Sequence, residues 1–179
     1  GKLDACIGLC FSDTRDVMET GRVHSNAKVV SSGNYTVICL PTYVEAFQNP
    51  RVREAIMCAI DTDATAIAAY GQLGITMDSY VSSMANFRKE YQTNRYDVER
   101  AKQLLKEAGY EEGDLSLYTV VSSNDSCSIA LAEIVQSFLA DVGIELQVDS
   151  YDFATAIQMQ RNGSVDLCIT TFYTTNNDI

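Results

Sequence analysis

The sequence contains no tryptophan, one histidine and only two prolines among its 179 residues. It also lacks any run approaching the roughly 18 apolar residues that a membrane-spanning helix needs. The first segment, "GKLDACIGLC", lacks the charged region and long apolar core of a signal peptide. We therefore expect a soluble chain, with any export signal outside the given sequence. Without a linker-like tract or an internal repeat, a single domain is expected.

Basic residues are scarce as well. Lysine and arginine together number 13, against 24 acidic residues, which gives a formal net charge of -11. Nucleic acids and anionic membrane surfaces are bound through clustered basic side chains, so neither is an expected partner. The acidity is interpreted as a source of solubility and not as a site for a cationic ligand.

The cysteines and the histidine show no catalytic or metal-binding spacing. Apolar runs surround most of the six cysteines, Cys6, Cys10, Cys39, Cys58, Cys127 and Cys168, which favours buried free thiols over a disulfide framework. Cys6 and Cys10 have no second pair at zinc-finger spacing, so no metal and no cofactor are predicted. His24 lies in a polar connector without a nucleophile-and-base motif. A Cys-His hydrolase is thus the least favoured function, and no enzyme is expected.

What is present is a series of helices and strands with marked ends. Strands are predicted at 3–9, at 35–40 after a turn at 31–34, and at 115–121, 144–148 and 165–173. Helix caps are predicted at Ser12 or Asp13, Asn49, Asp61, Asp97, Asp125 or Ser126, and Asp152, with ends at Gly71, Gly109, Gly143 and Gly163. Residues 72–96 form a long irregular stretch of the kind that serves binding or lid functions. The order of strands and helices predicts right-handed crossovers and a largely parallel sheet.

Three signatures follow one another in a fixed order along this framework. The segment "NPRVREAIMCAIDTDATA" resembles a "VR-x-A-(x)4-AID" helix, and "RYDVERAKQLLKEAGY" resembles a "Y-(D)-P-x-x-AK-x-LL-x-EAGY" helix. The segment "LADVGIELQVDSYDFATAIQMQRNGSVDL" resembles an "L-x-x-x-GI-x-V" element followed by a helix and "G-x-(Y)-D". Together they span essentially the whole chain and resemble the family-5 extracellular solute-binding proteins, the peptide, dipeptide and nickel receptors of ABC importers.

The resemblance implies an α/β fold of the class II periplasmic-binding-protein type, with a mixed, mostly parallel sheet flanked by helices. Full receptors of this family are much longer, so residues 1–179 are expected to form one domain, the second of two ligand-binding lobes. The implied function is to capture a peptide or other small solute between the lobes and deliver it to the permease. The implied location is extracellular, at the cell surface or in the periplasm.

The resemblance also implies the partners of the chain. They are the small solute, which includes oligopeptides, the ABC permease subunits and the other lobe of the receptor. Contact with the membrane is expected only through a lipid anchor of the full-length protein. The second interpretation of the chain is an effector-binding module of a transcriptional regulator, which would require a basic helix-turn-helix upstream. Because exported proteins usually pair their thiols, one or two disulfides remain an open alternative to six free thiols.

Ligand contacts are expected after strand ends and at helix N-termini, where open parallel sheets bind ligands. The predicted ligand-binding residues are Tyr35, Cys39, Ser122, Ser123, Asn124, Phe172, Tyr173 and Asn176. Two interpretations of 122–125 stay open, helix capping and ligand contact, and for Phe172 and Tyr173 the alternative is core packing. Peptide-binding relatives carry an acidic residue soon after the last strand. Here the first one is Asp178, which weighs against a peptide.

Overall fold

Residues 35–71, 74–77 and 95–172 are those that the computed structural model describes, and they all fall within one unit, residues 33–179. Several expectations lie outside them: the strand at 3–9, the helix from Ser12 or Asp13, the turn at 31–34 and most of the stretch 72–96. Cys6, Cys10 and His24 lie outside them too. No helix among the described residues is long and apolar enough to cross a membrane.

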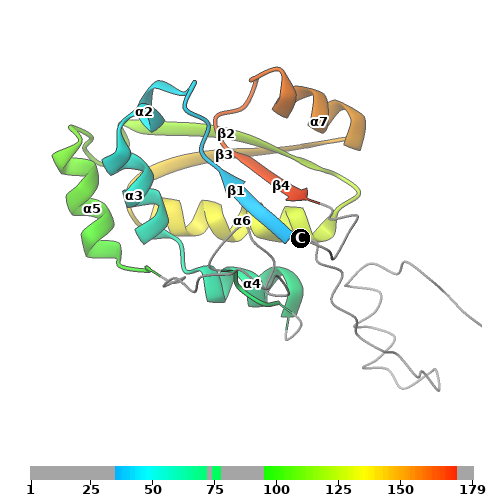
Figure 1. The fold of residues 1–179 in the computed structure, drawn as a ribbon, viewed down its shortest axis with the longest axis horizontal. Coiled ribbons are helices and arrows are strands. Elements are labelled where there is room, and N and C mark those ends of the chain that lie inside the picture. The colour runs from blue at the N-terminus through cyan, green and yellow to red at the C-terminus, as the bar shows by residue number, and fades with distance from the viewer. Residues whose placement is uncertain (1–34, 72–73, 78–94, 173–179) are drawn as a thin grey trace, which may run out of the picture. The chain divides into compact units, whose positions relative to one another are not determined.

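Helices and strands alternate through the described part of the chain (Figure 1). In order, the elements are β1 (Tyr35–Cys39), α2 (Glu45–Gln48), α3 (Pro50–Ala59), α4 (Thr62–Tyr70), α5 (Val98–Glu107), β2 (Leu115–Ser122), α6 (Ser126–Ala140), β3 (Ile144–Tyr151), α7 (Phe153–Arg161) and β4 (Cys168–Phe172). Only the short helix α2 has no counterpart among the sequence predictions.

Local signals fix the ends of these helices, as predicted. The side chains of Asn49, Asp61, Asp97, Asp125 and Asp152 each accept hydrogen bonds from backbone N–H groups in the first turn of α3, α4, α5, α6 and α7. After α5 the chain passes through Gly109 at a φ of 91°, and after α6 through Gly143 at 81°. Glycine takes up this left-handed conformation without the steric cost that other residues incur.

The strands form one parallel and one antiparallel ladder. β2 and β3 are parallel from Leu115 opposite Ile144 to Ser122 opposite Tyr151, and α6 connects them. β1 and β4 are antiparallel, with Tyr35 opposite Phe172. The α/β class is therefore confirmed, with both parallel and antiparallel pairing present. The described strands form two two-stranded sheets, one parallel and one antiparallel, so the predicted predominance of parallel pairing is not seen among them.

Backbone contacts also join β2 to the start of β4. The carbonyl of Tyr118 accepts hydrogen bonds from the N–H groups of Asp166 (2.8 Å) and Leu167 (3.2 Å). In return, the N–H of Tyr118 donates to the Asp166 carboxylate at 2.9 Å. Burial raises the pKa of the Tyr118 hydroxyl, and its hydrogen bond to Asp149 raises that pKa further. The two ladders are thus held together along β2.

Apolar side chains cover the strands on both faces. The main core packs α3, α5 and α6 against one face and includes Leu104, Leu117, Val121, Val135 and Leu146. A smaller cluster on the other face joins β2 and β4 to α7 and includes Val120, Ala156 and Val165. Figure 1 shows α7 and α6 on opposite sides of the strands. β1 contributes to both groups, Ile38 to the main core and Cys39 to the smaller cluster, which confirms its predicted cover on both faces.

Candidate functional site

Three strands end at the same edge of the sheet. Ser122 and Tyr151 close the parallel β2–β3 ladder side by side, and β4 runs from its contact with Tyr118 toward the same edge. Helices α6 and α7 begin there, directly after β2 and β3. Open sheets of this kind bind ligands at the carboxyl ends of their strands, where the first N–H groups of each following helix lack partners within the helix.

A groove of about 90 Å³ lies at this edge. It is lined by Val121, Ser122, Asp125, Ser128, Phe153, Ala156, Ile157, Gln160, Ile169, Thr170 and Thr171. The lining combines aliphatic and aromatic surface with hydroxyl and amide groups. Phe153, the first residue of α7, leaves 62% of its surface exposed and offers a large apolar contact. The groove is therefore suited to an uncharged part of a ligand.

The carboxylate of Asp125 is already engaged within the protein. It accepts hydrogen bonds from the N–H groups of Cys127 and Ser128, both at 3.1 Å, and from the Ser128 hydroxyl at 2.6 Å. These bonds cap α6 and hold Ser128 in place at the groove. The capping interpretation of this segment is confirmed for Asp125. Its negative charge is offset by the positive end of the α6 dipole.

Gln160 ties the strands together beside the groove. Its side-chain amide donates to the carbonyl of Val120 in β2 at 3.1 Å and to that of Ile169 in β4 at 3.4 Å. The two strands are thereby linked through α7, which carries Gln160. The position of α7, and with it that of Phe153, is thus fixed relative to the strand ends.

An aromatic pair stands at the end of the β1–β4 ladder. The rings of Tyr35 and Phe172 stack with centroids 5.6 Å apart and planes 26° apart. One residue further into the ladder, the hydroxyls of Thr36 and Thr171 are 2.9 Å apart, and Thr171 lines the groove. Phe172 keeps 46% of its surface exposed. The pair therefore extends the apolar surface available at this edge.

The structure brings several of the predicted site residues to this edge. Ser122 lines the groove. Ser123 and Asn124 form the exposed turn beside it, with the Ser123 N–H donating to the Tyr151 carbonyl at 2.7 Å. Cys39 lies at the far end of β1, opposite Cys168, and is not part of the groove. Tyr173 and Asn176 lie outside the described residues.

Other lining residues were not predicted from the sequence. Phe153, Ile157 and Gln160 come from α7, and Thr170 and Thr171 come from β4. The strand–Asp–helix order of 144–153 repeats that of 115–126, and this repetition is a signal that points to Phe153. The inward position of Ile157 and Gln160 depends on how α7 packs, which no local pattern specifies.

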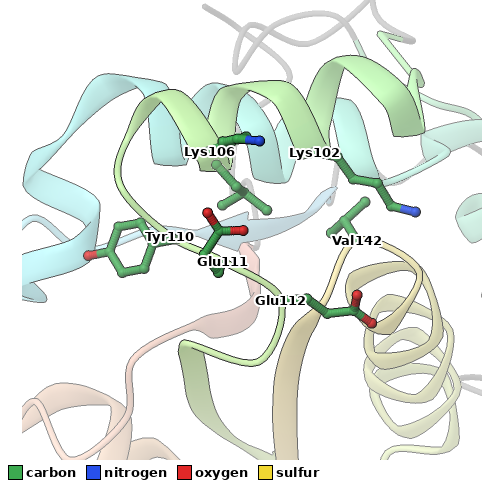
Figure 2. Close-up of a pocket in the computed structure, with 7 residues that line it drawn as sticks. Lys102, Lys106, Tyr110, Glu111, Glu112 and Val142 are labelled. Atoms are coloured by element: carbon green, nitrogen blue, oxygen red, sulfur yellow. The ribbon is translucent and has the colours of Figure 1, made fainter.

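A second pocket of about 200 Å³ opens at the opposite edge of the parallel ladder. Tyr110, Glu111 and Glu112, which precede β2, line it together with Val142, which precedes β3. Figure 2 shows Lys102 and Lys106 reaching from α5 above the two glutamates. Although this pocket is larger, it lies at the amino ends of the strands, and its charges are of both signs. The carboxyl-edge groove is therefore the candidate ligand site.

Comparison with known proteins identifies the family and the fold of the chain. Residues 12–179 match the family described as bacterial extracellular solute-binding proteins, family 5 middle. The chain is 33% identical over 129 residues to the glutathione-binding protein GsiB of Escherichia coli strain K12, a stretch that covers 72% of this chain and 25% of GsiB. The chain thus spans about a quarter of the length of the curated relatives it matches.

Two solved structures illustrate the fold. NikA from Brucella suis, crystallised with Fe(III)-EDTA, is 26% identical, with a TM-score of 0.68 over 81% of this chain and 32% of NikA. DppA from Helicobacter pylori, in complex with the peptide STSA, is 24% identical, with a TM-score of 0.77 over 92% of this chain and 32% of DppA. The class II periplasmic-binding-protein fold is thereby confirmed.

Proposed function

Because the chain belongs to the bacterial extracellular solute-binding proteins of family 5, we propose that it forms one ligand-binding lobe of an ABC importer's solute receptor. The groove at the carboxyl ends of β2, β3 and β4 is the observation that supports this most strongly. The chain matches only a quarter of the length of its relatives. The opposing lobe would therefore be formed by another part of the receptor. Proteins of this family are extracellular or periplasmic.

The mechanism follows from the position of the groove at the edge of the lobe. A solute that contacts both lobes favours the closed receptor to the extent that it binds the closed state more tightly than the open one. In this lobe, Ser122 and Thr170 offer hydroxyls, while Phe153 offers exposed apolar surface. The closed receptor then presents the solute to the permease subunits.

We propose a peptide or another small solute as the ligand. Among the lining residues, all of which the structure describes, none is basic, and the carboxylate of Asp125 is engaged in capping α6. Hydroxyl and amide groups next to aliphatic surface suit a peptide backbone or a similar neutral segment. The names of the relatives support this class, since GsiB binds glutathione and DppA was crystallised with a tetrapeptide. Charged ends of the solute would then contact other parts of the receptor.

The proposed role is binding without catalysis. The relatives are binding proteins, and the groove lining contains no cysteine or histidine. Among the described lining residues, therefore, no imidazole is present to act as a general base for the hydroxyls. Incubation of the receptor with its solute should leave the solute chemically unchanged, and conversion of the solute to a product would overturn this part of the proposal.

The test uses the full-length receptor that contains this segment. Solute retained through purification is released by denaturation and identified by mass spectrometry, and the same compound is then titrated into the receptor by calorimetry. Glutathione and the peptide Ser-Thr-Ser-Ala serve as first probes. We expect binding at micromolar or lower concentration to the receptor and much weaker binding to the 179-residue chain alone. Binding of equal strength to both would contradict a ligand site shared between two lobes.

A further inference from the structure

Cys39 and Cys168 lie directly opposite each other across the antiparallel β1–β4 ladder. Directly opposed residues in such a ladder have Cα atoms roughly 4.5 to 5.5 Å apart, and their side chains lie on the same face. This separation falls within the range of roughly 4.4 to 6.8 Å that disulfides span. Both thiols are free in the structure, and the strand register brings their backbones within the range that a disulfide can span.

The environment of the two thiols is shared. Both pack in the small cluster formed by Val120, Ala156 and Val165 on the α7 side of the strands. Cys168 is 9% exposed and Cys39 is half-buried. Burial raises the pKa of both thiols, and Cys39 raises that of Cys168 further. The effect of Cys39 on the pKa of Cys168 agrees with the closeness that the ladder register requires.

We propose that Cys39 and Cys168 form a disulfide that joins β1 to β4. Each thiol loses its proton and one electron, and a sulfur–sulfur bond forms. A small-molecule disulfide such as oxidised glutathione accepts the two electrons and is released as two thiols. Cys39, the more exposed partner, attacks first, and Cys168 then displaces the glutathione thiol from the mixed disulfide. Cys58 belongs to α3 and Cys127 to α6, so neither takes part in this ladder.

The bond would connect segments about 130 residues apart in the sequence. It would reinforce a two-stranded ladder whose other end carries Tyr35, Phe172 and the groove residue Thr171. The inference does not depend on the proposed function, because it rests on strand register and burial alone. If the receptor did not bind the solute, the proposed disulfide could still form. If the disulfide did not form, the proposed role of the groove would still stand.

The primary test maps the bond in the unmodified 179-residue chain. The protein is incubated in a glutathione buffer with excess oxidised form, quenched with acid, alkylated, digested and analysed by mass spectrometry. We expect one linked pair of peptides, containing Cys39 and Cys168, which separates after reduction. The proposal would be overturned if both cysteines were alkylated, if either were linked to another cysteine, or if glutathione remained on Cys39. Circular dichroism of the oxidised sample confirms that these results come from folded protein.

Thermal unfolding gives a second readout. The oxidised chain should unfold roughly 10 °C above the reduced chain, because closing a long loop restricts the unfolded state. The same difference is expected for Cys58→Ala, the matched control, and none for Cys39→Ala or Cys168→Ala. A difference that persists in either of the last two variants would contradict the assignment. If those variants do not fold, the peptide map of the unmodified chain decides alone.

Discussion

At the scale of single residues, two glycines with the same backbone conformation differ in their surroundings. Gly109 and Gly143 have φ values of 91° and 81°. A Cβ atom at Gly143 would lie 2.7 Å from the Glu112 Cγ and 3.0 Å from its Cα, whereas one at Gly109 would meet nothing within 4 Å. Replacing Gly143 with alanine therefore combines backbone strain with a clash, while replacing Gly109 introduces strain alone.

We predict that Gly109→Ala lowers the free energy of unfolding by about 1 kcal/mol, the usual cost of left-handed backbone in a residue other than glycine. Gly143→Ala should lower it by at least about 2 kcal/mol, because the α6–β3 turn must also move away from Glu112. Urea unfolding of the two variants in parallel measures the difference. Equal losses would show that the approach of Glu112 to Gly143 carries no energetic weight.

Asp125 provides a test that separates capping from charge. Removing its hydrogen bonds to Cys127 and Ser128 in Asp125→Ala should destabilise the protein by about 1 to 2 kcal/mol. Asparagine is an equally good cap, so Asp125→Asn should recover most of this loss in the same urea titration. If the asparagine variant were as unstable as the alanine variant, the negative charge and not the hydrogen bonds would stabilise α6.

The buried thiol of Cys168 should make the free energy of unfolding depend on pH in the alkaline range. Burial, and to a lesser degree Cys39, raises its pKa from an ordinary 9.0 to about 11. Between these values the thiol ionises in the unfolded chain but stays protonated in the folded one, so the folded state binds more protons and stability falls as pH rises. Below pH 9 this group has no effect, because it is protonated in both states.

The measurement compares unfolding free energies from pH 8 to pH 11 in the presence of a reductant. The slope between pH 9 and pH 11 should be steeper for the unmodified chain than for Cys168→Ala, since lysine and tyrosine residues titrate in both. Only the slopes are compared, because the variant also loses packing in the small cluster. Parallel slopes would contradict the raised pKa.

Helix caps are features that single residues of a sequence can predict. Asp61, Asp97 and Asp125 were all predicted correctly, because a cap depends on one side chain and the N–H groups two or three residues later. Cys39 was predicted to contact the ligand. Its place opposite Cys168 depends on a partner strand far away in the sequence.

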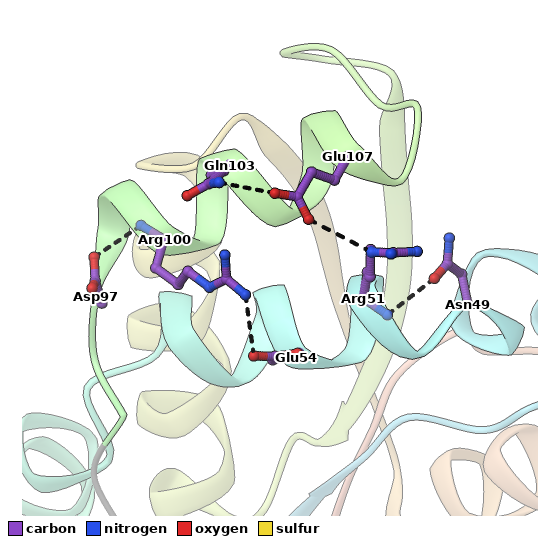
Figure 3. A network of polar contacts seen from close by, with 7 residues as sticks. All are labelled: Asn49, Arg51, Glu54, Asp97, Arg100, Gln103 and Glu107. Atoms are coloured by element: carbon purple, nitrogen blue, oxygen red, sulfur yellow. Dashed lines mark hydrogen bonds and ion pairs between the residues drawn. The ribbon is translucent and has the colours of Figure 1, made fainter.

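At the scale of elements, α5 packs along α3 with polar contacts at the rim and apolar contacts inside. Figure 3 shows Arg51 of α3 facing Glu107 of α5, with 3.6 Å between nitrogen and oxygen, and Arg100 of α5 facing Glu54 of α3 at 3.8 Å. All four side chains are substantially exposed to solvent. Exposed pairs of this kind contribute about 0 to 1 kcal/mol.

The apolar stripe of α5 should therefore dominate its attachment. Leu104 is 1% exposed within the main core, so Leu104→Ala should cost about 2 to 5 kcal/mol of unfolding free energy. Glu107→Gln, on the same helix, removes the charge opposite Arg51 and should cost less than about 1 kcal/mol. Chemical denaturation of both variants provides the comparison. A larger loss from Glu107→Gln would mean that the ion pairs and not the core hold α5.

Elements with strong local periodicity were predicted well, and so were the positions of the four described strands, but the antiparallel pairing of β1 with β4 was not. α5, α6 and α7 have clear caps and stripes, and their bounds agree closely with the predictions. The parallel β2–β3 pair follows from the α6 crossover, whose handedness and direction are constrained. The antiparallel partnership of β1 and β4 depends on packing between distant segments. The four-residue α2 is too short to show a period.

At the scale of the whole molecule, the general position of the candidate groove was predictable, but most of its lining was not. Ligand sites at the carboxyl ends of parallel strands follow from topology, and the segment after β2 was identified on that basis. The contributions of Phe153, Ile157 and Thr171 arise because α7 and β4 pack beside that segment. A fold-level rule therefore located the edge, and tertiary packing decided which side chains occupy it.

We propose that this edge, and not the larger pocket at the other end of the strands, contacts the solute. The most direct test of this claim is calorimetric titration of the full-length receptor with the solute released from it on denaturation. Phe153→Ala in the groove is compared with Lys106→Ala in the other pocket, and both side chains are exposed, so neither change disturbs the core. We predict at least a roughly 10-fold rise in Kd for Phe153→Ala and an unchanged Kd for Lys106→Ala. An unchanged Kd for Phe153→Ala together with a raised Kd for Lys106→Ala would contradict the claim.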